Sequence, residues 1–257
     1  MDLQTILSNI SPERPINHLS IPPSWHQGRT CYGGLSAVIA MHAARQNAPD
    51  LPPLQSGQVA FIGPLAGEIE VETTLLRRGR NSAFIQSNIR TDGQVALSCN
   101  FIFMAQRESS VACNIIQPPE FPNIPSDAEA RSGPPEFFTG QMQYPDKRIE
   151  LGMNTGRLAS WHRLKEFDGV DPLANLVCIA DALPPSAMGL MNEKGMVSSM
   201  NWQFNMLTDA PDTQNGWWFL ESQTHHAQNG ASSQYMTAWN SSRQAMMTGM
   251  QSVAIFV

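Results

Sequence analysis

The chain contains two long apolar segments whose pattern differs from that of the residues around them. The first, LSAVIAMHAARQNAP, covers residues 35–49 and is apolar on nearly every side of a helical projection until Arg45-Gln46-Asn47. Its length and alanine content favour a helix, which Pro49 ends. Because such a helix has no polar face for water, we expect it to be buried.

Four strand-like segments follow, at about 54–63, 68–78, 81–91 and 94–106. In EIEVETTLLRR, Ile69, Val71 and Thr73 alternate with glutamates, which is the period of two that a half-buried strand requires. Asp92-Gly93 lies between two of the segments, and Asp-Gly between apolar runs is a strong hairpin signal. The first half therefore predicts a helix followed by an antiparallel meander.

The second half has the same plan. RIELGM and GRLASWHRLKEF (148–153 and 156–167) are typical of strands, and the second apolar segment, DPLANLVCIADAL, predicts a helix over 171–183. Asp168 or Asp171 can cap this helix, with Pro172 in its first turn and Pro184-Pro185 beyond its end. Four more strand-like segments follow, near 197–207, 216–227, 231–239 and 244–256.

Each half thus combines one buried helix with an antiparallel meander. A lone apolar helix wrapped by a curved antiparallel sheet is the hotdog architecture, an α+β arrangement. We expect two hotdog domains, related by a pseudo-twofold axis, with their sheets joined edge to edge.

Residues 107 to about 140 differ from both halves, because six prolines lie there among Ser, Asp and Glu. Connections of this length are uncommon inside one compact domain. We therefore predict an N-terminal domain over 1–106, a proline-rich linker over 107–140 and a C-terminal domain over 141–257.

Composition narrows the range of functions. The formal net charge of the 257 residues is −6, which argues against a broad surface for DNA or RNA. No apolar run approaches the ~20 residues that a membrane span needs, and the N-terminus lacks the pattern of a signal peptide. The four cysteines show no metal-binding spacing, so we expect reduced, mostly buried thiols in a cytoplasmic protein.

Short motifs in both halves carry a family resemblance. They are Tyr32-Gly33-Gly34, Leu76–Ser82 and Asn100-Phe101 in the first half, and Ile179–Ala182, Val197–Asn201 and Met250–Ser252 in the second. Their order and spacing, over roughly 15–106 and 157–257, resemble the acyl-CoA thioesterase II family of double hotdog proteins. The resemblance implies hydrolysis of acyl-CoA to a free acid and CoA, without a cofactor or a metal ion.

In that family an Asp, a Thr or Ser, and a Gln hold the water that attacks the thioester. The resemblance assigns these roles to Asp181, Ser199 and Gln251. The sequence departs from the family after the serine, where Asp-His is replaced by Asn201-Trp202. An aromatic-His pair further along that strand is also absent.

The residues themselves are compatible with this chemistry. Asp181 is at the end of a predicted helix, where the macrodipole and partial burial would raise its pKa and suit it to act as a general base. The alternative is that it bonds only to turn amides before the two prolines. Ser199 has no adjacent His-Asp pair and no nucleophile elbow, so we expect it to position water. Gln251 can hold the water or the carbonyl through its amide.

Two further groups are candidates for substrate binding. Gly33 and Gly34 precede the first helix, whose free N–H groups could polarise a thioester carbonyl, although close packing alone would also require glycine. Arg77, Arg78 and Arg80, with Arg90 across the hairpin, could bind the phosphates of CoA. A solvated strand end is the alternative for these arginines.

Two other functions fit the same fold. An (R)-hydratase is weakly suggested by Gly169-Val170-Asp171-Pro172-Leu173, but the histidine that such enzymes use as a base does not follow. A non-catalytic acyl or acyl-CoA binding protein is the second alternative. Because the fused sheet keeps two outer edges, we also expect self-association into dimers or tetramers.

Overall fold

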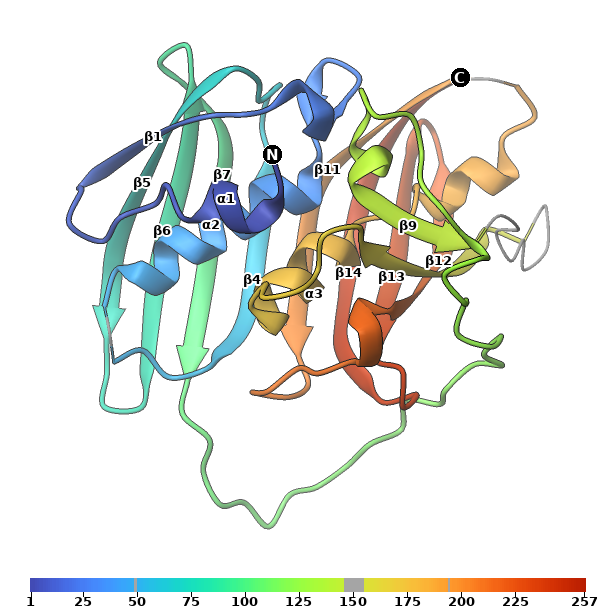
Figure 1. Cartoon of the computed structure of the whole chain (residues 1–257). Helices are drawn as coiled ribbons and strands as arrows, with labels where there is room; N and C mark the ends of the chain where they lie inside the picture. The colour runs from blue at the N-terminus through green and yellow to red at the C-terminus, as the bar shows by residue number, and fades with distance from the viewer. Residues whose placement is uncertain (49, 146–154, 194) are drawn as a thin grey trace.

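The computed structural model describes residues 1–48, 50–145, 155–193 and 195–257, and within them a twelve-stranded antiparallel sheet forms the centre of the molecule (Figure 1). The elements of the first half are α1 (Leu3–Leu7), β1 (Ile16–Ser20), η1 (Pro23–Trp25), β2 (His26–Gln27), β3 (Thr30–Cys31), α2 (Gly33–Gln46), β4 (Leu54–Phe61), β5 (Glu68–Arg78), β6 (Ser82–Thr91) and β7 (Gln94–Met104). The predicted helix and four strands of this half are confirmed to within a few residues.

The remaining elements repeat this order. They are β8 (Ala130–Arg131), η2 (Phe138–Gln141), β9 (Met142–Pro145), β10 (Arg157–Leu164), α3 (Pro172–Ala180), η3 (Ser186–Leu190), β11 (Met196–Met206), η4 (Gln214–Gly216), β12 (Trp218–Gln228), β13 (Ala231–Trp239) and β14 (Ala245–Phe256). The strand predicted at 148–153 lies outside the described residues.

The order of strands across the sheet is β1-β5-β6-β7-β4-β11-β14-β13-β12-β10-β9-β8. The two halves meet where β4 pairs with β11, with Gln58 opposite Gln203 at the middle of the paired stretch. On the inner face of β11, Trp202 and Phe204 are fully buried. The predicted α+β double hotdog, with its two sheets joined edge to edge, is confirmed.

Helix α3 has the boundaries that its local sequence favours. The Asp171 carboxylate caps its first turn by accepting a 2.9 Å hydrogen bond from the Ala174 N–H, and Pro172 occupies the first helical position. The helix ends at Ala180, three residues before the predicted end. Asp181 is its C-cap, with φ −95° and ψ 9°, and prolines follow shortly after.

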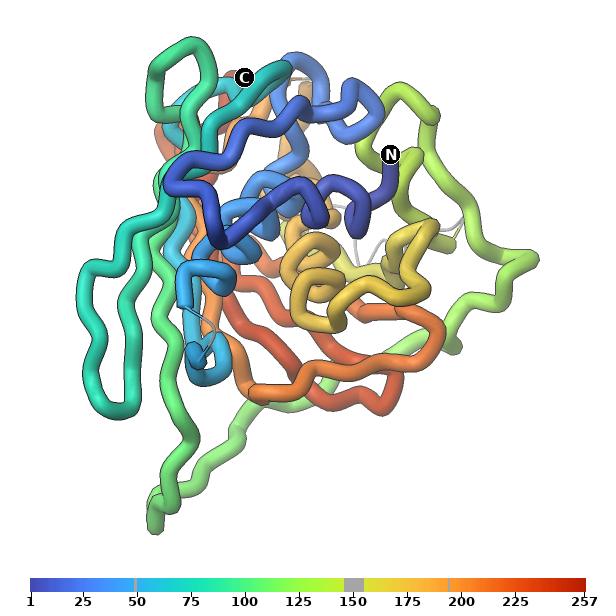
Figure 2. Tube along the Cα trace, turned by 60° about the vertical axis from the view of Figure 1, so that its left-hand side comes forward, coloured from blue at the N-terminus to red at the C-terminus, as the bar shows by residue number. Residues whose placement is uncertain are grey.

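The two central helices lie side by side and run in opposite directions, on the same side of the sheet (Figures 1 and 2). At one end, Arg45 of α2 forms a 3.1 Å ion pair with Asp171 of α3. At the other end, the Tyr32 hydroxyl donates a 2.7 Å hydrogen bond to the Cys178 carbonyl oxygen. The start of α2 is therefore fixed against the end of α3.

Part of the connection between the halves packs on the opposite face of the sheet from the two helices. Phe121 lies against Phe219 and Trp239, with ring centroids 4.7 and 5.6 Å apart, and the Trp161 indole donates to the Pro122 carbonyl oxygen at 3.2 Å. These rings form a second hydrophobic cluster, separate from the main core. The boundaries proposed at 106 and 140 remain predictions, but the connection is in contact with the C-terminal half.

Replacing Phe121 with Ala should lower the free energy of unfolding by roughly 2 kcal/mol, because the side chain is half-buried and a fully buried Phe→Ala change costs more. Urea unfolding monitored by tryptophan fluorescence measures this. Ile115→Ala, in the same connection but 81% exposed, is the matched control and should leave the midpoint unchanged. Equal midpoints for both variants would show that the cluster does not anchor the connection.

Candidate active site

Asp181 lies where the C-terminus of α3 meets the N-terminus of α2. The backbone N–H of Gly34 hydrogen-bonds to its carboxylate. The N-cap residue of α2, Tyr32, makes no side-chain capping bond, so the carboxylate of the other half satisfies a free donor of this helix. The sequence predicted that the free N–H groups at the start of α2 face the substrate. One of them, at Gly34, faces Asp181 instead.

Gly33 and Gly34 are required by close packing at this junction. A Cβ atom on Gly33 would overlap with the Asp181 carboxylate, and a Cβ atom on Gly34 would overlap with the carbonyl oxygen of Cys178. The Phe61 ring from the end of β4 lies close to the same Cβ position on Gly33. Both glycines therefore bring the helices together and leave the carboxylate beside the first turn of α2.

Gln251 and Ser199 join Asp181 in one hydrogen-bonded chain. The Gln251 amide nitrogen donates to a carboxylate oxygen of Asp181 at 2.6 Å. The Ser199 hydroxyl donates to the Gln251 amide oxygen at 3.4 Å, a long bond. The structure thus brings together three residues from a helix end and two strands that are distant in sequence.

A β-bulge in β11 places Ser199 on the inner face. The register against β14 shifts between Ser199 and Asn201, so Met200 is an extra residue and is exposed. The Asn201 side chain points outward and accepts a 2.9 Å hydrogen bond from the Ser252 N–H, which holds the irregular strand. Bulges of this kind redirect side chains beside active sites. The Asn201-Trp202 departure is therefore part of the bulge that positions Ser199.

Burial raises the pKa of the Asp181 carboxyl to about 7 from its usual value of 3.8. The hydrogen bonds from Gln251 and Gly34 oppose this by stabilising the ionised form. At neutral pH the group is close to half ionised, so it can accept a proton and return it. This is the behaviour expected of a general base.

The arginines predicted to bind CoA phosphates lie elsewhere. Strand register places Arg77 and Arg78 opposite Phe84 and Ala83, at the end of the sheet that holds Leu54. Phe61, which touches Gly33, is at the other end of the same strand, about 20 Å away along the chain direction. Arg78 forms a 2.8 Å ion pair with Asp50.

Arg90 was expected to join this cluster across the hairpin, and that expectation is wrong. Arg90 pairs with Glu70, near the opposite end of β5 from Arg77 and Arg78. Because β5 and β6 are long, Arg90 near the end of β6 lies far from the tip of the hairpin that joins them. The segment that faintly resembles a hydratase motif is also structural, since its Asp171 caps α3 and pairs with Arg45.

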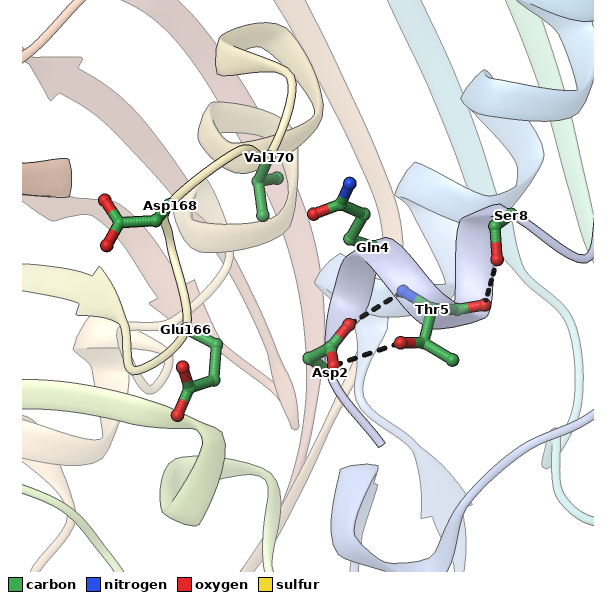
Figure 3. Close-up of a pocket in the computed structure, with 7 residues that line it drawn as sticks. All are labelled: Asp2, Gln4, Thr5, Ser8, Glu166, Asp168 and Val170. Atoms are coloured by element: carbon green, nitrogen blue, oxygen red, sulfur yellow. Dashed lines mark hydrogen bonds between the residues drawn. The ribbon is translucent and has the colours of Figure 1, made fainter.

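The surface has an open pocket of about 380 Å³ between α1 and the segment after β10 (Figure 3). Its lining includes Asp2, Gln4, Glu166, Asp168 and Val170. The Asp2 carboxylate accepts hydrogen bonds from the N–H and the hydroxyl of Thr5. The predicted site residues do not line this pocket. Within the described part of the chain, no group of three His, Cys, Asp or Glu side chains is arranged to hold a metal ion, and no helix is long and apolar enough to cross a membrane.

Sequence reasoning missed two residues of the site. Tyr32 is buried and its hydroxyl donates to the end of α3, whereas only the two glycines of its motif were predicted to have a role. Gln234 is buried and donates to Gln251 at 2.9 Å. Its signal was available in ASSQYMTAW, where it shares the inward period of two with Met236 and Ala238.

Both halves of the chain match family models of acyl-CoA thioesterase domains. Residues 21–104 match the family model for the acyl-CoA thioesterase N-terminal domain, and residues 117–255 match the model for the acyl-CoA thioesterase C-terminal domain. No curated protein sequence matches the chain.

Solved structures show the same fold along the whole chain. A hot dog fold protein of unknown function from Alicyclobacillus acidocaldarius aligns with a TM-score of 0.82 and 15% identity, covering 100% of this chain and 99% of that one. An acyl-CoA thioesterase II from Mycobacterium marinum aligns with a TM-score of 0.75 and 16% identity, covering 99% and 97%. These TM-scores establish a common fold.

The raised pKa of Asp181 predicts how stability depends on pH. Because the folded protein binds this proton more tightly than the unfolded chain does, the contribution of Asp181 is fully present below about pH 4. It is lost as pH rises to about 7, by an amount on the order of 4 kcal/mol. Asp181→Asn should remove this dependence.

The measurement is urea unfolding of the wild type and the variant from pH 4 to pH 8. Asp209→Asn, which changes an exposed aspartate in the same way, should follow the wild type. Parallel curves for the wild type and Asp181→Asn would contradict a pKa raised by burial.

Proposed function

Because the chain belongs to the acyl-CoA thioesterase family, we propose that it hydrolyses acyl-CoA to a free carboxylic acid and CoA. The observation that supports this most directly is the hydrogen-bonded chain of Ser199, Gln251 and Asp181. Its carboxyl group has a pKa of about 7, raised by burial, and Asp181 as a whole residue is half-buried.

In the proposed reaction, Asp181 accepts a proton from a water molecule as the water oxygen attacks the thioester carbonyl carbon. Gln251 and Ser199 position that water through their amide and hydroxyl groups. The tetrahedral intermediate then expels the CoA sulfur, and the proton held by Asp181 passes to the leaving thiolate. One water is consumed, and the products are the acid and the free thiol.

Two substrate contacts are part of the proposal. Gly33, in the first turn of α2, lies beside Asp181, and its N–H is proposed to donate to the thioester oxygen as negative charge develops on it. Arg77, Arg78 and Arg80 are proposed to bind CoA phosphates. Their distance from Asp181 requires an extended CoA, which is long enough to separate its phosphates widely from the thioester.

The alternative within this fold is a protein that binds acyl-CoA without hydrolysing it. Purified protein with a panel of short, medium, branched and aromatic acyl-CoA substrates separates the two, since a colour reagent detects each free thiol released. Thiol release supports the enzyme, whereas tight binding without release supports the binding protein. A cytoplasmic location and a role in fatty acid metabolism remain predictions.

Asp181→Asn should lower kcat by roughly 10²-fold or more while leaving acyl-CoA affinity nearly unchanged, because the base is lost and the shape is kept. Ser199→Ala and Gln251→Ala should cost less, since each removes only one contact to the water. Steady-state kinetics and calorimetric binding measure the two effects separately.

Combining Ser199→Ala with Gln251→Ala should cost less than the sum of the single effects if the residues act as a unit. Ser198→Ala, the exposed neighbour on the outer face of β11, is the matched control and should be fully active. Full activity of Asp181→Asn would rule out the proposed base.

We further propose that the protein self-associates into dimers or tetramers. The sheet keeps β1 and β8 as outer strands, and each is paired on one side only among the described residues. Exposed strand edges of this kind favour pairing with another chain. Sedimentation at micromolar concentration should therefore give a mass of two or four chains, and a strict 28.3 kDa monomer would contradict it.

A further inference from the structure

The hydrogen-bonded chain of the site continues past Gln251 into the core. Gln234 of β13 lies directly opposite Gln251 of β14, and both side chains are almost fully buried. The Gln234 amide nitrogen donates to the Gln251 amide oxygen at 2.9 Å. The Gln234 amide oxygen accepts from the backbone N–H and the hydroxyl of Ser186, at 2.9 and 3.2 Å.

A backbone group fixes the direction of the whole chain. The N–H of Ser186 can only donate, so the atom of Gln234 that faces it must be the amide oxygen. The amide nitrogen of Gln234 then faces the oxygen of Gln251, and the nitrogen of Gln251 faces Asp181. Both amide orientations thus follow from one backbone donor at the start of η3.

Ser186 is itself held in place. Its hydroxyl lies 2.8 Å from the Thr224 hydroxyl and accepts a 3.2 Å hydrogen bond from Ser222. Ser222 and Thr224 belong to β12, which pairs with β13, the strand of Gln234. The support for Gln251 therefore comes from hydrogen bonds that connect β13 to the start of η3 and to β12.

We propose that Gln234 is a positioning residue that keeps the N–H donor of Gln251 directed at Asp181. This inference rests on the proposed function for its catalytic meaning, but its structural content does not depend on turnover. Without Gln234, the only remaining donor among the described contacts of the Gln251 oxygen is Ser199, at 3.4 Å. The amide of Gln251 is then free to turn and present its oxygen to the carboxylate.

Turning the amide changes which form of Asp181 is stabilised. A carbonyl oxygen beside the carboxyl favours the protonated form, whereas an N–H donor favours the ionised form. The titratable groups that interact with the Asp181 charge are the Tyr32 phenol and the Cys178 thiol, and burial, followed by that charge, raises the pKa of each well above its usual value. Both stay neutral near pH 7, so a change in the titration of Asp181 reports on the amide.

The test measures the titration of Asp181 directly, by NMR of protein with ¹³C-labelled aspartate carboxyls. Loss of one signal in Asp181→Asn assigns the resonance. Gln234→Met removes the donor without adding charge, and Gln234→Glu keeps the acceptor for Ser186 while replacing the donor nitrogen with oxygen. We expect both variants to raise the pKa of Asp181 by about one unit or more.

Gln203→Met is the matched control, because this glutamine is exposed on the outer face of neighbouring β11. It should leave the titration unchanged. If Gln234→Met does not fold, Gln234→Asn replaces it, since its shorter side chain cannot reach both Ser186 and Gln251. An unchanged titration in a folded, uncharged Gln234 variant overturns the proposal, as does a shift seen with Gln234→Glu alone, which a new negative charge explains.

The kinetic consequence distinguishes positioning from a general loss of structure. In Gln234→Met, kcat/KM should fall about tenfold at pH 6 and return close to the wild-type value at pH 9, with little change in KM. A loss that is equal at every pH would indicate a merely structural role. If the wild type releases no thiol, the proposed function fails, and the NMR titration still decides whether Gln234 orients Gln251.

Discussion

The close approach of two helix ends is the constraint on which the rest of the site depends. The first turn of α2 can reach the last turn of α3 only because residues 33 and 34 have no Cβ atom, as either Cβ would overlap with the opposite helix end. The Tyr32 hydroxyl and the Arg45–Asp171 ion pair then hold the helices at their two ends. The Asp181 carboxylate of one half is thereby placed against a helix N-terminus of the other half.

Two opposing electrostatic effects act on that carboxylate, and their magnitudes decide its behaviour. The N-terminus of a helix stabilises a negative charge by about 1 kcal/mol, and by ~2 kcal/mol in buried geometry. Burial raises the pKa of Asp181 to about 7. Desolvation therefore destabilises the ionised carboxylate by more than the hydrogen bonds from α2 and Gln251 stabilise it. If the helix end and the amide were absent, the group would stay protonated at neutral pH. The site is a balance in which burial sets the direction of the shift and the donors limit its size.

Much of this arrangement could be predicted from residues close together in sequence. Periods of two and long apolar segments, together with Asp171-Pro172 and Asp92-Gly93, were sufficient for strands β4 to β7 and β10 to β14 and for helices α2 and α3. Strands β1, β2, β3, β8 and β9 were not predicted. The bulge in β11 could not be placed, because it depends on register against β14 rather than on local pattern. The prediction that Arg90 joins Arg77 and Arg78 was wrong for a related reason, since strand length decides which residues share an end of the sheet. The family resemblance identified Asp181, Ser199 and Gln251 as site residues, whereas Gln234 is identified only from its contact with Gln251 in the folded chain.

One row of inward side chains explains why the polar site belongs to the C-terminal half. Strand pairing places Thr224, Gln234, Gln251 and Trp202 side by side across four strands, and the row continues into the first half as Val59, Cys99 and Ser87. Trp202 separates the polar members from the apolar Val59 and the buried Cys99 thiol, whose pKa burial raises. The C-cap residue of helix α2 is Asn47, whereas the C-cap residue of α3 is Asp181. The first half therefore contributes a helix N-terminus and a hydrophobic wall, and the second half contributes the ionisable group with the amides that orient it.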